Sequence, residues 1–277
     1  MSIAPPMPYS GGKQSIAERI ADTFPPHHHY VEPYAGALSV LLAKKPAPIE
    51  TVNDLNGDIV NFWRVLRDQP ERLERLLALT PHSRAEYLAT RNGFEDAPDD
   101  LERARRVWVA LTQSRGSMLQ RSGWRFVHGT NRFSLAAYLT GYTARVAPAA
   151  ERLRRVSLEC RPALDVIAAY ERPDALIYVD PPYLGSTRKG GQYVHEMTSD
   201  NEHSELLAAL VDSPAMVALS GYDSPLYAEA LTGWHVTRMA ATDMNRSAKV
   251  ECLWTNYEPH THTGDLLTAL LDEEAPA

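Results

Sequence analysis

Residues 175–193 have the sequence ALIYVDPPYLGSTRKGGQY, and the first six of them have the pattern of a buried strand that ends in a carboxylate. A short apolar run followed by turn residues is typical of a strand in the middle of a parallel sheet. Each proline fixes its own φ and extends the residue before it, so Asp180 and Pro181 are expected to be extended, with carbonyl groups that no local turn uses. The stretch therefore predicts a rigid group of hydrogen-bond acceptors at the carboxyl end of a strand.

The same alternation of strands and helices continues on both sides of this stretch. Strands are predicted at 29–34, 49–54, 155–160, 175–180 and 215–220, helices at 15–24, 35–45, 59–68, 162–170 and 203–212, and a closing pair of β segments at 234–240 and 250–257. Strand and helix in alternation indicate a parallel sheet with crossover helices. The predicted fold class is α/β with a Rossmann-like sheet.

Between the two halves of this pattern the strand signals disappear. Residues 71–148 have a helical and loop-like sequence, so we predict an inserted, mostly helical region there. The catalytic domain would then be discontinuous, comprising residues 1–70 and 149–265, and residues 266–277 would form a polar tail.

Composition limits the class of protein. The 277 residues are 44% hydrophobic, carry a net charge of -7, and include only two cysteines, Cys160 and Cys252. The sequence contains no apolar run of membrane-spanning length and its start does not have the pattern of a signal peptide, so a cytoplasmic protein without a disulfide framework is expected. The successive residues His27, His28 and His29 would point to alternate faces of a strand, so no metal site is expected from them.

The charge is distributed unevenly. Residues 101–161 contain twelve arginines and three acids, which gives +9 and leaves -16 for the rest of the chain. Such a segment is either an electrostatic surface for phosphates or a set of solvated helix faces.

Two other predicted strands also end in polar residues. The first ends in Glu32, Pro33 and Tyr34, with Gly36 allowing a tight turn, and the second ends in Asn53 and Asp54. In parallel sheets ligands bind at this edge, and an acid about twenty residues after the first strand is where a nucleoside-binding fold holds ribose hydroxyls. The alternatives are a solvated acid for Glu32 and a helix N-cap for Asp54.

The amino-terminal motif PYSGGK, residues 8–13, has an aromatic residue, two glycines and a lysine before a helix. It lacks the spacing of a phosphate-binding P-loop, and it suits the binding of an aromatic ring and a carboxylate. In residues 180–183, DPPY, the Asp180 carboxylate and the Pro181 carbonyl can accept both N–H groups of an exocyclic amino group. Tyr183 offers a ring for stacking, and catalysis would be mainly orientation and electrostatics.

These four motifs, in this order, resemble the Dam-like, D12-class DNA adenine-N6 methyltransferases, in the order of that family's α group. The resemblance covers most of residues 8–257. It implies a Rossmann-like methyltransferase fold, S-adenosylmethionine as methyl donor with no metal, double-stranded DNA as substrate, and flipping of the target base. It assigns Tyr9 and Lys13 to the methionine end of the cofactor and Asp54 to its ribose, with Asp165 near its adenine.

The full set of residues predicted from the motifs and the resemblance has three parts. The catalytic residues are Asp180, Pro181, Pro182 and Tyr183. The cofactor-binding residues are Tyr9, Gly11, Gly12, Lys13, Glu32, Pro33, Tyr34, Gly36, Asn53, Asp54, Asp165 and Asp180. The DNA-binding residues are Arg115, Arg121, Trp124, Arg125, Arg132, Arg188 and Lys189.

Other interpretations remain open at this point. A cytosine-N4 DNA methyltransferase uses the same amino-group chemistry, and an RNA or protein amide methyltransferase has a related strand end. From another class, the chain could be a catalytically silent DNA-binding protein. A monomer from a bacterium or phage is expected, either alone or alongside a cognate restriction nuclease, and no membrane partner is expected.

Overall fold

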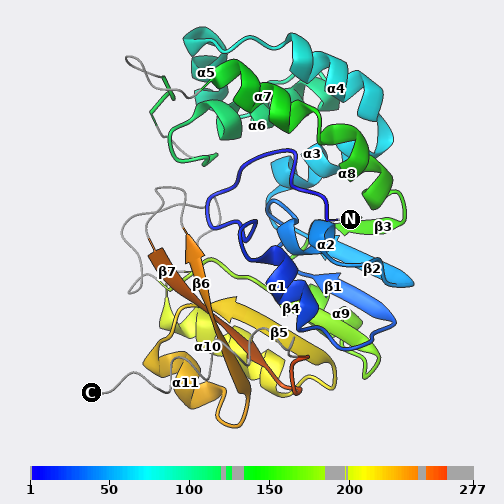
Figure 1. The fold of residues 1–277 in the computed structure, drawn as a ribbon, viewed down its shortest axis with the longest axis vertical. Helices are drawn as coiled ribbons and strands as arrows, with labels where there is room; N and C mark the ends of the chain where they lie inside the picture. Colours follow the sequence, from blue (N-terminus) through cyan, green and yellow to red (C-terminus); the bar gives the residue numbers. More distant parts are fainter. Residues whose placement is uncertain are drawn as a thin grey trace.

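The computed structural model describes residues 2–119, 123–126, 134–184, 197, 199–242 and 248–260. Within them, seven strands form one sheet in the order β3-β2-β1-β4-β5-β7-β6 (Figure 1). The strands are β1 His29–Glu32, β2 Ile49–Asn53, β3 Val156–Glu159, β4 Ala175–Val179, β5 Met216–Gly221, β6 His235–Thr242 and β7 Ala248–Thr255. Strands β1 to β5 pair with one another in parallel, whereas β7 is antiparallel to both β5 and β6, so the predicted α/β class is confirmed.

Helices cover both faces of the sheet. They are α1 Ala17–Asp22, α2 Ser39–Ala43, α3 Gly57–Asp68, α9 Ala163–Tyr170, α10 Asp200–Val211 and α11 Pro225–Ala230. Alternate residues of β4 enter different cores, because side chains alternate across a strand. Leu176 and Tyr178 pack with the residues of α1–α3, and Ile177 and Val179 pack with those of α9–α11. The strand is thus buried on both faces, as its continuous apolar sequence predicts.

The inserted region is helical, as predicted. Its elements are α4 Pro70–Leu79, α5 Arg84–Ala89, the short 3-10 helix η1 Thr90–Asn92, α6 Asp100–Gln113, α7 Leu135–Thr143 and α8 Val146–Leu153. Helices α4 to α7 lie together beyond one end of the sheet (Figure 1). Their apolar residues belong to the same core as α1–α3, and the fully buried Trp108 donates a hydrogen bond to the Pro6 carbonyl, 3.0 Å away. Helix α8 spans the predicted boundary at residue 148.

One predicted helix is shorter than expected. The sequence indicates a helix over 35–45, but α2 begins only at Ser39. Gly36 and Leu38 have φ values of 46° and 52°, which are incompatible with a right-handed helix. The Ala35 N–H donates to the Asn53 carbonyl over 2.7 Å, so residues 35–38 form a turn against the end of β2.

The antiparallel strand β7 has a consequence for the site. Cys252 of β7 is paired with Gly221, the last residue of β5. Because β7 runs opposite to the parallel strands, its first residues lie at the edge where the parallel strands end. Side chains from the start of β7 can therefore reach the same region as Asp180.

Candidate active site

A cavity of about 340 Å³ opens at the carboxyl ends of the parallel strands. Strand β1 lies between β2 and β4, so the residues that end these three strands are brought together. Eleven of the twelve predicted cofactor-binding residues line the cavity: Tyr9, Gly11, Gly12, Lys13, Glu32, Pro33, Tyr34, Gly36, Asn53, Asp54 and Asp180. The exception is Asp165, which is exposed on α9, and residues 162–164 line the cavity instead.

The turn after β1 is held by Asp54. The Gly36 N–H donates to Asp54 Oδ2 over 2.9 Å, and the Gly36 carbonyl accepts from Trp63 Nε1 over 2.9 Å. A Cβ atom at Gly36 would lie 3.2 Å from two carbons of the Tyr9 ring. Asp54 is not the N-cap of α3, because the cap is the Asn56 side chain. Gly36 is thus required both for its positive φ and for the close approach of Tyr9.

Asn53 lines the cavity, but hydrogen bonds to backbone groups occupy its amide. Its Nδ2 donates to the carbonyls of Pro33 and Arg161, over 2.9 and 3.0 Å, and its Oδ1 accepts from the Arg161 N–H over 2.9 Å. Its observed contacts hold the end of β1 against the segment after β3.

Two carboxylates and a tyrosine surround the Lys13 ammonium. Lys13 Nζ lies 2.6 and 2.8 Å from the two Asp180 oxygens and 2.5 Å from the Tyr183 hydroxyl. Burial raises the pKa of Asp180, and Lys13 opposes that shift. The second carboxylate is Glu251 of β7, whose Oε1 lies 3.7 Å from Lys13 Nζ. No motif in the sequence points to Glu251.

Glu32 is a buried acid that faces the same cavity. It accepts a hydrogen bond from the Tyr30 hydroxyl over 2.8 Å, so it is not the solvated acid of the alternative interpretation. Burial raises its pKa to about 8, and the charge of Asp180 adds to the shift. Burial thus disfavours the ionised form of Glu32.

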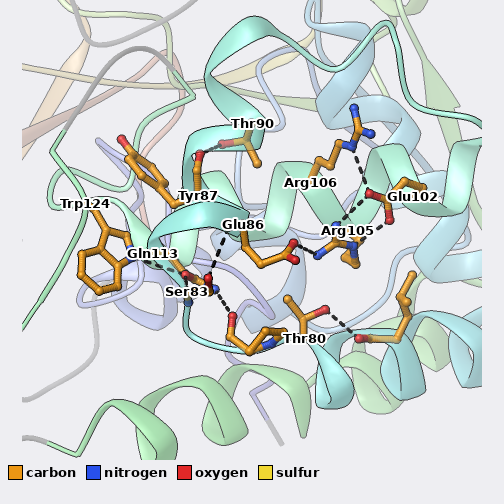
Figure 2. A network of polar contacts seen from close by, with 12 residues as sticks. Thr80, Ser83, Glu86, Tyr87, Thr90, Glu102, Arg105, Arg106, Gln113 and Trp124 are labelled. Atoms are coloured by element: carbon orange, nitrogen blue, oxygen red, sulfur yellow. Dashed lines mark hydrogen bonds and ion pairs between the residues drawn. The ribbon is translucent and has the colours of Figure 1, made fainter.

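Many arginines of the basic segment form ion pairs inside the protein. Figure 2 shows Arg105 between Glu86 and Glu102, with Arg106 on the other side of Glu102. Among the ten arginines of residues 101–161 that the structure describes, the following six pair with described acids: Arg103, Arg105, Arg106, Arg152, Arg154 and Arg161. These six positive charges are each balanced by a nearby carboxylate, so the number of arginines overstates the positive surface available to phosphates.

The predicted DNA-binding residues that the structure describes lie together in a short antiparallel segment. Ser114 and Trp124 form a β-bridge, and the Arg125 N–H donates to the Gln113 carbonyl over 2.7 Å. Trp124 stacks on His82 with ring centres 4.6 Å apart, and the exposed Arg115 lies 4.9 Å from the Phe126 ring. Arg125 donates to the Ser114 carbonyl over 3.1 Å. Arg121, Arg132, Arg188 and Lys189 lie outside the described residues.

This antiparallel segment touches the amino-terminal motif. The Ser10 N–H donates to the Ser117 carbonyl over 3.1 Å, and Ser117 is fully buried with a φ of 50°. The segment that carries Arg115 and Trp124 is thereby connected to the loop that carries Lys13. Sequence spacing contained no signal for this contact.

The sequence pattern of the D12 class of N6 adenine-specific DNA methyltransferases matches residues 9–242. The chain belongs to this family. The match confirms the resemblance drawn from the four motifs, and it decides between the interpretations in favour of adenine. This D12-class methyltransferase is an enzyme that methylates adenine in DNA.

Several known proteins are similar to this D12-class methyltransferase over most of its length. It is 27% identical over 285 residues to the type II methyltransferase M1.LlaDCHI of Lactococcus lactis subsp. cremoris, which covers 93% of this chain and 96% of that protein. It is 25% identical to the DNA adenine methylase of Salmonella typhi, covering 92% and 95%. The DNA adenine methylase of Vibrio cholerae serotype O1 is 26% identical over 63% of each chain.

Two further observations concern the described part of this methyltransferase. None of its helices there has the length and apolar character needed to cross a bilayer. Within the same described residues, no three His, Cys, Asp or Glu side chains lie where they could hold a metal ion together.

Proposed function

We propose that S-adenosylmethionine is the methyl donor of this enzyme and binds in the cavity at the carboxyl ends of the strands. The observation that carries the proposal is the gathering of eleven predicted residues from four separate motifs around one cavity. The charges also fit. Glu32, Asp54 and Asp180 line the cavity, and Lys13 is the single Lys or Arg among its described lining residues, which suits a ligand with a sulfonium and an ammonium group.

Different residues at the cavity would bind the cofactor and orient the adenine. The bound cofactor supplies a methyl group on a positively charged sulfur. Tyr9 and Lys13 would hold its methionine end, and Asp54 its ribose. Asp180 and the Pro181 carbonyl would accept the two N–H groups of a flipped-out adenine, with Tyr183 beside the base. Accepting both hydrogens aims the N6 lone pair and leaves proton abstraction unnecessary before the transfer.

Incubation of DNA with labelled S-adenosylmethionine, followed by nucleoside mass spectrometry, tests this proposal. We expect label in N6-methyladenine. Label only in N4-methylcytosine, or DNA without label alongside a protein that binds the cofactor, would contradict it. The second of these outcomes would favour the catalytically silent DNA-binding protein.

Gly36→Ala is expected to weaken cofactor binding at least tenfold. The added Cβ would stand 3.2 Å from the Tyr9 ring in a backbone conformation with φ of 46°. Calorimetric titration with S-adenosylmethionine measures the effect. The matched control is Gly93→Ala, since Gly93 also has a positive φ, 100°, but has no atom within 4 Å of an added Cβ. Equal affinity in both variants would show that Tyr9 does not define the cavity wall.

Arg115 is proposed to contact DNA phosphate. Its side chain is exposed on the segment 114–126, and no ion pair to an acid is found for it among the described residues. Arg115→Ala should weaken DNA binding and reduce the slope of log K against log salt by about one. Arg154→Ala is the control, because Arg154 pairs with Glu151 on α8. An unchanged salt slope in Arg115→Ala would contradict the proposal and would indicate that Arg115 lies outside the DNA-binding surface.

We also propose a biological context, a source and a target-recognition region for this enzyme. The Lactococcus relative is named a type II methyltransferase, which supports a cognate restriction nuclease as one context for this enzyme. Relatives from bacteria and from Escherichia phage P1 support a bacterial or phage source. A cytoplasmic monomer that needs no metal is proposed, and the inserted region 71–148 is proposed as the part that recognises the target sequence.

A further inference from the structure

Glu251 is a buried acid in the active site that no sequence motif identified. Its side chain is 5% exposed, and it accepts a hydrogen bond from the Tyr183 hydroxyl over 2.9 Å. It belongs to β7, outside the residues 9–242 that match the family pattern. A buried carboxylate is costly unless it is paired, so this position requires a physical explanation.

The groups around Glu251 form one charged cluster. Lys13 Nζ lies 3.7 Å from Glu251 Oε1 and 2.6 Å from Asp180 Oδ1. Lys13 and Asp180 alone would have a net charge of zero. With an ionised Glu251 the cluster carries a net charge of -1, in an environment where charges are weakly screened.

Methyl transfer to adenine creates positive charge beside this cluster. The N6 lone pair forms the new N–C bond while the C–S bond of the donor breaks and leaves its electron pair on sulfur. N6 carries a positive charge until one of its protons leaves to water. A neutral Lys13–Asp180 pair would stabilise that charge weakly, whereas a cluster with one excess negative charge stabilises it as it develops.

We propose that Glu251 is a positioning residue for methyl transfer, which holds Lys13 and Tyr183 and gives the Asp180 site its net negative charge. The inference rests on the proposed function of Asp180. Glu251 is a second carboxylate in ion-pair distance of the Lys13 ammonium, at 3.7 Å, so it shares the positive charge of Lys13 with Asp180, whose two oxygens accept hydrogen bonds from Lys13. Its hydrogen bond to the hydroxyl fixes the Tyr183 ring beside the base.

The variant Glu251→Gln separates charge from shape. Glutamine keeps the size and an oxygen that accepts from the Tyr183 hydroxyl, and it removes the charge. We expect kcat for methylation of unmethylated plasmid DNA to fall by about 10–100-fold, with KM for DNA within about threefold of the wild-type value. Glu258→Gln, an exposed change seven residues further along, is the control and should leave kcat unchanged.

The pH dependence of kcat tests the charge of Glu251, because a purely structural role would leave that pH dependence unchanged. Burial raises the pKa of Glu251, Lys13 opposes the shift, and Asp180 raises it further. Among the described residues, the titratable groups near it are Lys13, Asp180, Tyr183 and the adjacent Cys252, and its cross-strand partner on β6 is the uncharged Met239. Protonation of either carboxylate removes the excess negative charge. The acid limb of kcat in Glu251→Gln should therefore shift to lower pH, because Asp180 then titrates without a second carboxylate beside it.

Two further variants make the test decisive. Glu251→Asp retains the charge, so its kcat should stay within about fivefold of the wild-type value and its acid limb should match that of wild type. This variant also tests the inference if Glu251→Gln fails to fold. Tyr183→Phe removes a hydrogen bond that lowers the pKa of Glu251, so its acid limb should move to higher pH, opposite to the shift expected for Glu251→Gln. Wild-type kcat and an unshifted acid limb in Glu251→Gln would overturn the inference. An inactive wild-type enzyme would instead refute the proposed function.

Discussion

Asp180→Ala is expected to abolish methyl transfer while leaving the fold largely intact. Asp180 follows β4 directly, its side chain is 19% exposed, and it faces the cavity with both oxygens oriented by Lys13. Removing the carboxylate removes one of two acceptors for the adenine amino group and the charge that stabilises N6 as it becomes cationic. Loss of one such oriented group costs about 10²–10³ in kcat, and loss of the charge adds to that figure.

Single-turnover methylation of DNA measures this effect. Asp180→Asn keeps the size and one acceptor oxygen but lacks the charge, so its rate should lie between those of wild type and Asp180→Ala. Asp174→Ala is the matched control, because Asp174 is exposed near the opposite end of β4, where it pairs with Arg172. An Asp180→Ala enzyme with more than about a tenth of the wild-type rate would refute the assigned role.

The same carboxylate sets an expectation for pH. Burial raises the pKa of Asp180, so the folded protein takes up its proton at a higher pH than a solvated aspartate would. Methyl transfer requires the ionised form of Asp180. As the pH is lowered, the wild-type rate should therefore begin to fall at a pH above the range in which a solvated aspartate takes up its proton.

Glu50→Ala is expected to cause the largest loss of stability. Glu50 of β2 is 4% exposed and lies between two buried cations, Lys44 and Arg152. Its Oε1 is 2.8 Å from Lys44 Nζ and 2.8 Å from Arg152 Nη2, and it also accepts from the Ala47 N–H over 3.0 Å. Removing it would leave two buried positive charges without a counter-ion. The free energy of unfolding should fall by about 3–5 kcal/mol.

Urea unfolding of the two variants measures this loss. Glu151→Ala is the control, because Glu151 pairs with Arg154 on the same helix as Arg152 but both side chains are more than two-thirds exposed, at 73% and 69%. Its free energy of unfolding should change by less than about 1 kcal/mol. A small effect of Glu50→Ala would mean that water reaches Lys44 and Arg152 in the variant.

Glu50 also explains how the inserted region is attached. Arg152 belongs to α8, the last helix before the strands resume, and it donates to the Leu41 carbonyl of α2 over 3.1 Å. Lys44 lies 4.4 Å from the centre of the Tyr30 ring, and the Tyr30 hydroxyl bonds to Glu32 in the cavity. A chain of buried polar contacts thus runs from α8 to the cavity at the carboxyl ends of the strands.

Some predicted features could be derived from local sequence because their causes are local. The apolar run before Asp180 predicts β4, and the glycine after β1 predicts a tight turn. The length of α2 could not be derived, since the turn at residues 35–38 depends on a hydrogen bond from Gly36 to Asp54, eighteen residues away. For the same reason the sequence left Asp54 with two interpretations, and the observed capping of α3 by Asn56 removes one of them.

The sequence by itself determined the α/β class, the family, and eleven cofactor-binding candidates that line the cavity, because strand ends in a parallel sheet meet at one edge wherever they occur in the chain. Only the tertiary structure decided which acids and arginines act together. Glu251 reaches Lys13 because β7 is antiparallel and begins at the edge where β4 ends. Arg103 pairs with Asp58 across 45 residues, and Arg152 with Glu50 across 102. Tertiary packing brings such partners together, and their spacing along the chain does not predict the contact.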